Sequence, residues 1–80
     1  MEKQLNELKK GEEGIIIKVT GEGKIRRRLF DMGVTPGADV VLTKKAPLGD
    51  PLQINIRGYE LSLRKDEAQY VTLKITKEVK

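Results

Sequence analysis

Hydrophobic residues recur at short, regular intervals along the chain, and the first group of them is typical of a β-strand. Residues 15–20 are rich in β-branched side chains, which favour extended structure. In an extended segment Ile15, Ile17 and Val19 share one face, whereas Ile16 lies on the opposite face. We therefore predict a first strand over residues 15–20.

Four later segments show the same alternation or a similar β-branched cluster, and glycine, proline or charged residues bound each of them. These segments are Val40–Thr43, Leu52–Ile56, Tyr59–Leu63 and Val71–Ile75. Arg57 and Gly58 are the two residues between the third and fourth predicted strands, which is the spacing of a tight β-hairpin. The pattern therefore predicts five strands in all.

The hydrophobic period changes between residues 24 and 32. Ile25, Leu29 and Met32 are spaced i, i+4 and i+7, as on one face of an α-helix. Gly33 follows at once, where a left-handed helix C-cap favours glycine. We predict one helix, inserted between the first and second strands. A second, shorter helical turn is predicted over residues 65–68.

Proline and glycine mark the connections. Pro36-Gly37 predicts a type I or II turn, and residues 46–51 predict a loop in which Asp50 accepts hydrogen bonds from nearby backbone N–H groups. We assign structural roles to the residues that shape these turns: Gly33, Pro36, Gly37, Gly49, Pro51 and Gly58.

The two ends of the chain carry weaker signals. Leu5 and Leu8 are three residues apart, so residues 1–10 are expected to form a turn or short helix that must pack against the rest of the protein to persist. Residues 76–80 are expected to fray. Since 80 residues suffice for one domain, residues 1–80 are treated as a single domain.

Short alternating strands joined by tight turns predict a mainly β fold. A small sheet must protect its edge strands, and closing into a barrel removes them. We therefore expect a small SH3-like five-stranded β-barrel with one α-helix inserted after the first strand. An open α+β sandwich is the alternative.

The composition excludes several kinds of chemistry. The chain has no cysteine and no histidine, which removes thiol nucleophiles, imidazole bases and Cys/His metal sites. Carboxylates are the other side chains that could bind a metal, but the acidic pairs Glu12-Glu13 and Asp66-Glu67 are adjacent in sequence. Their side chains therefore point apart rather than toward one ion. We expect no enzyme activity, no metal site and no cofactor. The chain also lacks an apolar run of membrane-spanning or signal-peptide length, so we expect a cytoplasmic protein.

Positive charge is concentrated in the predicted helix. Lys24, Arg26, Arg27 and Arg28 place four positive charges within five residues of a chain whose net charge is +4. This cluster is compatible with a solvated helix face, with an acidic protein partner, or with nucleic acid. Barrels that bind nucleic acid present aromatic residues among basic ones, and the aromatic residues here are isolated, so nucleic acid is the less favoured partner.

Several segments together resemble the ferrous iron transport protein A (FeoA) family. The segment Arg28–Gly37, with the letters RLFDMGVTPG, resembles the family signature. The order and spacing of four further segments also resemble the family: Leu5-x-x-Leu8-x-x-Gly11, Pro47–Pro51, Gly58–Arg64 and Glu67-Ala68. The resemblance implies an SH3-like barrel with an inserted helix. It also implies a small cytosolic protein that binds FeoB, a membrane Fe(II) transporter with a GTP-binding domain, and that supports or regulates Fe(II) uptake.

Two surfaces are the candidates for contact with such a partner. On the helix we select the outward arginines and the apolar residues beside them: Arg26, Arg27, Arg28, Leu29 and Phe30. Phe30 lies about 100° around the helix from Leu29, so we expect it to be half-buried. On the second surface, the loop before the third strand, we select Pro47, Leu48 and Asp50. We expect a monomer, and a nucleic-acid-binding barrel that uses Lys24–Arg28 remains the alternative function.

Overall fold

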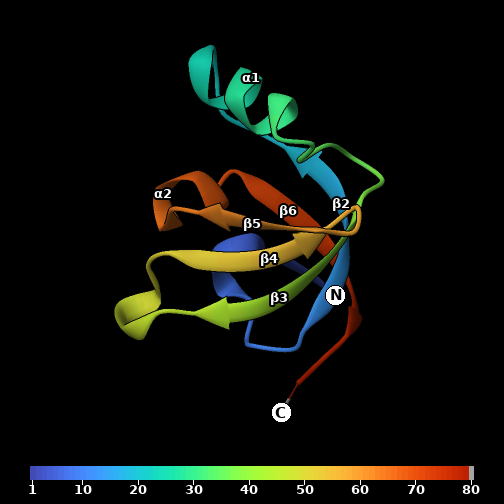
Figure 1. Cartoon of the computed structure of the whole chain (residues 1–80). Coiled ribbons are helices and arrows are strands. Elements are labelled where there is room, and N and C mark those ends of the chain that lie inside the picture. The colour runs from blue at the N-terminus through green and yellow to red at the C-terminus, as the bar shows by residue number, and fades with distance from the viewer. Residues whose placement is uncertain (80) are drawn as a thin grey trace.

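A six-stranded antiparallel sheet forms most of the computed structural model, which describes residues 1–79. Figure 1 shows the sheet strongly curved, with α1 lying beyond one end of it. In chain order the elements are β1 (Glu2–Gln4), the 3₁₀ turn η1 (Leu5–Glu7), β2 (Glu13–Val19), α1 (Lys24–Asp31), β3 (Asp39–Lys45), the 3₁₀ turn η2 (Pro47–Gly49), β4 (Leu52–Ile56), β5 (Tyr59–Leu63), α2 (Lys65–Ala68) and β6 (Val71–Lys77).

The predicted mainly β class is confirmed. Over the described residues the structure has six strands where five were predicted, and its sheet is open where a closed barrel was predicted. The strands lie in the order β1-β6-β2-β3-β4-β5, and within residues 1–79 the outer edges of β1 and β5 do not pair with each other. The additional strand is β1, whose Lys3 lies opposite Leu73 of β6. Residues 2–4 carry no hydrophobic alternation, so only the neighbouring strand makes them extended.

A β-bulge in β2 overturns the expected alternation of the first strand. Ile16 lies opposite Leu73 of β6, but Lys18 lies opposite Thr72, so Ile17 is the extra residue between the two pairs. The extra residue reverses the faces beyond it. As a result Ile16 and Val19 are both buried, whereas Ile17 is 42% exposed and does not share a buried face with Val19.

The hydrophobic core lies on the concave side of the curved sheet. Its members come from every strand except β1, with contributions from both helical elements and from the N-terminal segment: Leu5, Leu8, Ile16, Val19, Leu29, Val34, Ala38, Val40, Leu42, Leu52, Ile54, Ile56, Leu63, Ala68, Val71 and Leu73. β4 shows the predicted alternation most clearly, because its three apolar side chains are all fully buried. Leu5 and Leu8 of the N-terminal segment both pack into this core.

The predicted turns have the geometry that their residues favour. The N–H of Ala38 donates to the carbonyl oxygen of Thr35 at 3.2 Å, and Gly37 between them has φ +94°, which makes this a type II turn. Arg57 and Gly58 both have positive φ, at 51° and 85°, as the two central residues of a type I′ hairpin turn require.

The expected fraying at residues 76–80 is wrong for much of that segment. Strand β6 continues to Lys77, and the N–H of Val79 donates to Oε2 of Glu12 at 3.1 Å. The cause is Glu12, whose buried carboxylate needs hydrogen-bond donors and fastens the segment after β6. Lys80 lies outside the described residues.

Candidate protein-binding surfaces

Helix α1 places a single side chain in the hydrophobic core. Leu29 is completely buried, while its neighbours on the expected apolar face are more open. Ile25 is an exposed hydrophobic residue, and Met32 only packs partly against the core. In this conformation Leu29 is therefore inaccessible to a partner, which differs from the contact role that the sequence predicts for it.

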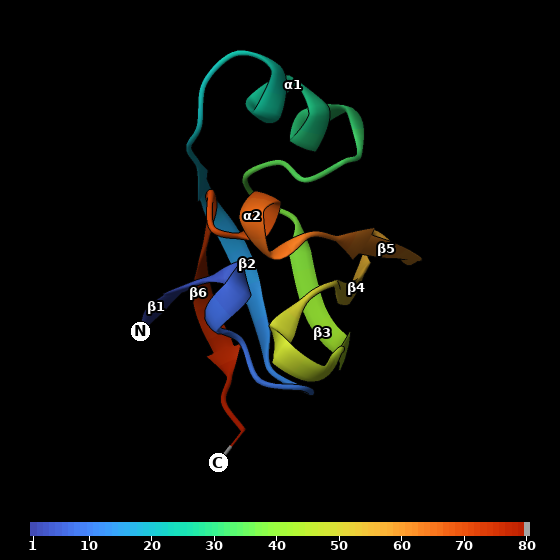
Figure 2. The ribbon, with the colours of Figure 1, turned by 90° about the vertical axis from the view of Figure 1, so that its left-hand side faces the viewer.

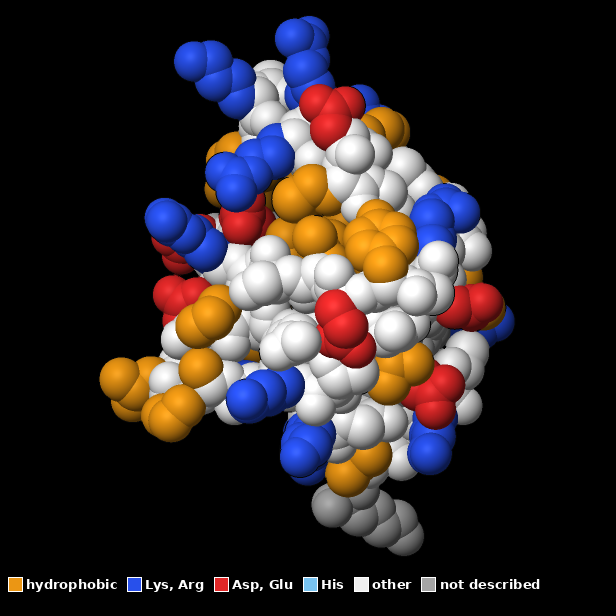
Figure 3. Space-filling model, in the orientation of Figure 1, with side chains coloured by type: hydrophobic (Ala, Val, Ile, Leu, Met, Phe, Trp, Pro, Cys, Tyr) orange, Lys and Arg blue, Asp and Glu red, His pale blue; other side chains and the backbone are white. Residues whose placement is uncertain are grey.

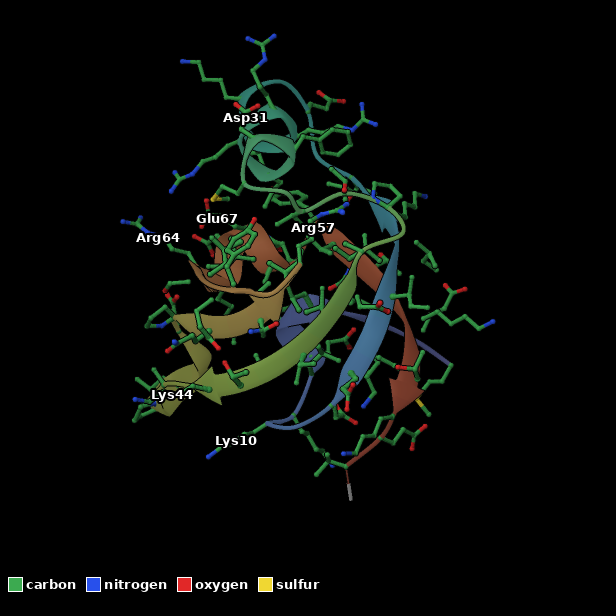
Figure 4. All side chains as sticks on the ribbon, turned by 45° about the vertical axis from the view of Figure 1, so that its right-hand side comes forward. Lys10, Asp31, Lys44, Arg57, Arg64 and Glu67 are labelled. Carbon is green, nitrogen blue, oxygen red and sulfur yellow. The ribbon has the colours of Figure 1, made fainter. Side chains whose placement is uncertain are left out.

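Polar contacts from the β4–β5 hairpin hold the C-terminal end of α1. The hydroxyl of Tyr59 donates to the carbonyl oxygen of Met32. Arg57 donates from Nε to the carbonyl oxygen of Gly33 at 3.2 Å and from Nη2 to Oγ1 of Thr35 at 2.6 Å. Figure 4 shows Arg57 near the segment that follows α1. Sequence reasoning treated Arg57 only as a turn residue, because nothing in the local pattern signals a contact with residues more than twenty positions away.

The three consecutive arginines of α1 have three different environments. Nε of Arg28 lies 3.2 Å from Oε2 of Glu67 on α2, and the guanidinium of Arg26 lies 4.9 Å from the centre of the Phe30 ring. Arg27 forms no ion pair within residues 1–79. Phe30 is 37% exposed, close to the half-buried position that the helical period predicts. Arg27 is therefore the arginine most available to a partner.

A shallow groove separates α1 from the start of α2. It encloses about 260 Å³ and is lined by Lys24, Ile25, Arg28, Arg64, Asp66 and Glu67. Figure 4 shows Arg64 and Glu67 together on the side of the molecule below α1. Because both signs of charge line the groove, it suits the mixed polar surface of a protein better than a single small ion. We call the exposed residues Lys24, Ile25, Arg26, Arg27, Arg28 and Phe30 the helix surface.

The second candidate surface is the turn η2, and we call Pro47–Gly49 the loop tip. Leu48 is 97% exposed and has φ +70°, a backbone region that non-glycine residues rarely adopt. In Figure 3 hydrophobic side chains project from the molecule where η2 lies. Asp50 differs from expectation: its Oδ1 accepts the N–H of Lys65 at 3.1 Å, so it fastens the start of α2 rather than capping its own loop.

The helix surface and the loop tip lie far apart. Figures 1 and 2 both place α1 beyond one end of the sheet, while η2 extends from the other end of β3 and β4. The residues selected from the sequence therefore form two separate surfaces and not one.

Among residues 1–79, no three acidic side chains come together in a way that could hold a metal ion. None of the helices there is long and apolar enough to cross a membrane.

Comparison with known proteins identifies the family. The sequence model of the FeoA domain matches residues 3–75. Over 72 residues, or 90% of this chain, the sequence is 33% identical to an Fe(2+) transport protein A/Fe(2+) transporter FeoB fusion protein of Porphyromonas gingivalis. The chain spans only 8% of the length of that relative.

Solved structures agree with the sequence comparison. A FeoA-like protein of Clostridium acetobutylicum is 37% identical, with a TM-score of 0.89 over 99% of this chain and 92% of that one. FeoA of Stenotrophomonas maltophilia, solved with zinc and described as an SH3 domain protein, is 28% identical, with a TM-score of 0.75 over 88% of this chain and 87% of that one. The matched sequence and fold together show that the chain belongs to the FeoA family, which is linked to ferrous iron transport.

Proposed function

We propose that this protein is a cytoplasmic accessory protein that binds the transporter FeoB and supports or regulates Fe(II) uptake. The observation that carries the proposal is the relative in which a FeoA segment and FeoB form one chain. In that relative the two parts are joined and stay side by side. Where the two proteins are separate chains, they must bind each other to stay together in the same way. In this proposal the protein acts by contact with its partner and has no catalytic role.

The helix surface is the main contact in this proposal. Arg27 is exposed and has no ion-pair partner within residues 1–79, while the stacked Arg26 and Phe30 offer a cationic and aromatic pair beside it. Arginine and aromatic side chains are enriched where protein interfaces gain most of their affinity. The adjoining groove adds charges of both signs that can fix the orientation of the partner. Arg26 and Arg28 already have partners within residues 1–79, which leaves fewer free cations for the phosphates of a nucleic acid.

Titration of the isotopically labelled protein with FeoB tests this function. The soluble GTP-binding domain, with and without a GTP analogue, and the detergent-solubilised full-length transporter serve as partners, and amide chemical shifts report the contact. We expect shifts concentrated on residues 24–33. Arg27→Glu should weaken binding at least fivefold, whereas the matched charge reversal Lys74→Glu, at an exposed position on β6, should leave it unchanged. Absence of binding to every form at tens of micromolar would overturn the proposal.

A further inference from the structure

Leu48 combines two features that do not stabilise the folded chain. Its side chain is 97% exposed, the largest value among the exposed large hydrophobic residues, and its backbone has φ +70°. Exposure of the apolar side chain to water is unfavourable, and positive φ is unfavourable because the Cβ comes too close to the backbone of its own residue. This conformation holds the apolar side chain of Leu48 outward, where it is free to contact a surface outside the chain.

The backbone of this turn is also unusually poor in free donors. Pro47 and Pro51 have no N–H group. The N–H of Gly49 donates to the carbonyl oxygen of Ala46 at 2.8 Å, and the N–H of Ala46 donates to the carbonyl oxygen of Pro51 at 3.1 Å. Among residues 46–51, the two prolines have no N–H and the N–H groups of Ala46 and Gly49 are already bonded. Four of these six residues therefore have no N–H that needs water, which lowers the free-energy cost of moving this backbone into an apolar medium.

Lysines lie beside the loop tip, whereas the one acidic residue that directly follows it, Asp50, accepts the N–H of Lys65 through Oδ1. Lys44 precedes the turn on β3, and Nζ of Lys45 donates to the carbonyl oxygens of Asn6 and Leu8 at 3.2 and 3.1 Å, which holds a second ammonium at the base of the turn. Figure 4 shows Lys44 and Lys10 extending from the side of the molecule that carries η2. Neither forms an ion pair within residues 1–79.

We propose that the loop tip is a shallow membrane anchor, in which Leu48 enters the interfacial layer of an anionic bilayer while Lys44 and Lys10 contact the phosphates of lipid headgroups. The proposal rests on the proposed function only in that FeoB, a membrane protein, would bring the chain to a bilayer. Binding at a membrane surface needs two weak signals that act together, and here the apolar Leu48 supplies one and the lysines supply the other.

Two features favour a bilayer over a pocket on a partner protein. A single protruding residue buries far less than the roughly 800 Å² per partner of a stable protein interface. The flanking cations are lysines, whose flexible point charges suit mobile headgroups, whereas fixed carboxylates are better matched by the planar fork of arginine. Binding through one leucine and two lysines should be weak and should decrease as salt screens the headgroups.

Vesicle co-sedimentation of the full chain, without FeoB, tests the anchor. Vesicles of phosphatidylcholine with phosphatidylglycerol in equal amounts are compared with vesicles of phosphatidylcholine alone, at low and at high salt. We expect partitioning onto the anionic vesicles, a decrease of at least threefold in high salt, and broadening of the Leu48 methyl signals by a spin-labelled lipid. Absence of binding to anionic vesicles at low salt would overturn the proposal.

Two substitutions separate the anchor from general adhesion. Leu48→Gly removes the side chain and suits the positive φ, so the fold is retained, and it should lower partitioning at least threefold. Ile17→Thr, at an exposed position on β2, should leave partitioning unchanged. Equal partitioning of Leu48→Gly and the unsubstituted chain would contradict the proposal. The proposal would also be contradicted if Leu48→Gly weakened binding to detergent-solubilised FeoB and the unsubstituted chain did not bind vesicles. That result would leave the proposed function intact and would place Leu48 in a pocket on the partner protein.

Discussion

Glu12 is the one fully buried charged residue that the structure describes, and hydrogen bonds compensate its burial. Its carboxylate accepts the N–H of Lys9 at 2.7 Å and the N–H of Val79 at 3.1 Å, and Nζ of Lys3 lies 3.2 Å away. The hydrogen bond from Lys9 is the largest cause that lowers the pKa of Glu12, and it acts with those from Val79 and Lys3 against burial, which raises the pKa. One side chain therefore joins the N-terminal strand, the turn before β2 and the segment after β6.

The lowered pKa predicts a pH dependence of stability. Because the folded chain holds the proton of Glu12 less tightly than the unfolded chain, the stabilisation is present above the ordinary glutamate pKa of about 4.3 and is lost as the pH falls through the lower folded value. Glu12→Gln should reduce the free energy of unfolding at neutral pH by roughly 1–3 kcal/mol. Glu12→Gln should also make the free energy of unfolding fall less steeply as the pH is lowered. Urea unfolding between pH 7 and pH 3 measures both effects.

The matched control for Glu12 is its neighbour. Glu13 is more open and lies 3.7 Å from Nζ of Lys77, so Glu13→Gln should change the free energy of unfolding by less than about 1 kcal/mol. If both variants show the same pH profile as the unsubstituted chain, the buried carboxylate is not the source of the acid sensitivity.

Gly33 illustrates a second residue-scale constraint. It has φ +87° after the last turn of α1, and a Cβ at this position would lie 2.5 Å from the hydroxyl oxygen of Tyr59. Gly33→Val should therefore lower the free energy of unfolding by about 2 kcal/mol or more, since backbone strain and a clash act together. Arg27→Ala, at an exposed position, should stay within about 0.5 kcal/mol. Thermal melting compares the two, and equal melting temperatures would contradict this account of the helix end.

At the scale of elements, α1 is the part least secured by apolar contacts. Leu29 is its only buried residue, so the hydrogen bond from Tyr59 to Met32 and the ion pair of Arg28 with Glu67 contribute much of its attachment. A helix held mainly by exposed polar contacts opens more readily than the sheet below it.

Removal of the Tyr59 hydroxyl should loosen α1 selectively. Tyr59→Phe deletes the donor to Met32 and should cost about 1 kcal/mol of local stability. Amide hydrogen exchange should then accelerate roughly fivefold in residues 28–33 and stay unchanged in β4. Tyr70→Phe is the matched control, because the hydroxyl of Tyr70 has no hydrogen-bond partner within residues 1–79. Uniform acceleration over both α1 and β4 would show that the helix does not open independently.

Sequence reasoning succeeded for elements that carry their own pattern and failed where a neighbour decides. β4 and β5 have the predicted bounds, because strict alternation and a two-residue turn determine both. Strand β1 and the bulge at Ile17 depend on pairing with β6, which the local sequence does not contain. The same limit applies to the site. The arginines of α1 could be selected from their sequence, but the partners of Arg28 and the anchoring role of Arg57 come from remote segments.

At the scale of the whole molecule, the two candidate surfaces lie at separate ends of the sheet (Figures 1 and 2). A chain that binds FeoB through the helix surface can therefore present the loop tip to a bilayer at the same time. Two weak contacts on one rigid body reinforce each other only when the geometry allows both to form together.

Simultaneous use of both surfaces predicts additive effects in a membrane. With FeoB reconstituted in anionic nanodiscs, Arg27→Glu and Leu48→Gly should each weaken binding, and the double variant should show the sum of the two free-energy changes within about 0.5 kcal/mol, because the sites share no contacts. With FeoB in detergent, Leu48→Gly should have no effect while Arg27→Glu retains its own. If Leu48→Gly weakens binding equally in detergent and in nanodiscs, both substitutions act on one protein interface, since a bilayer contact cannot persist once the bilayer has been removed.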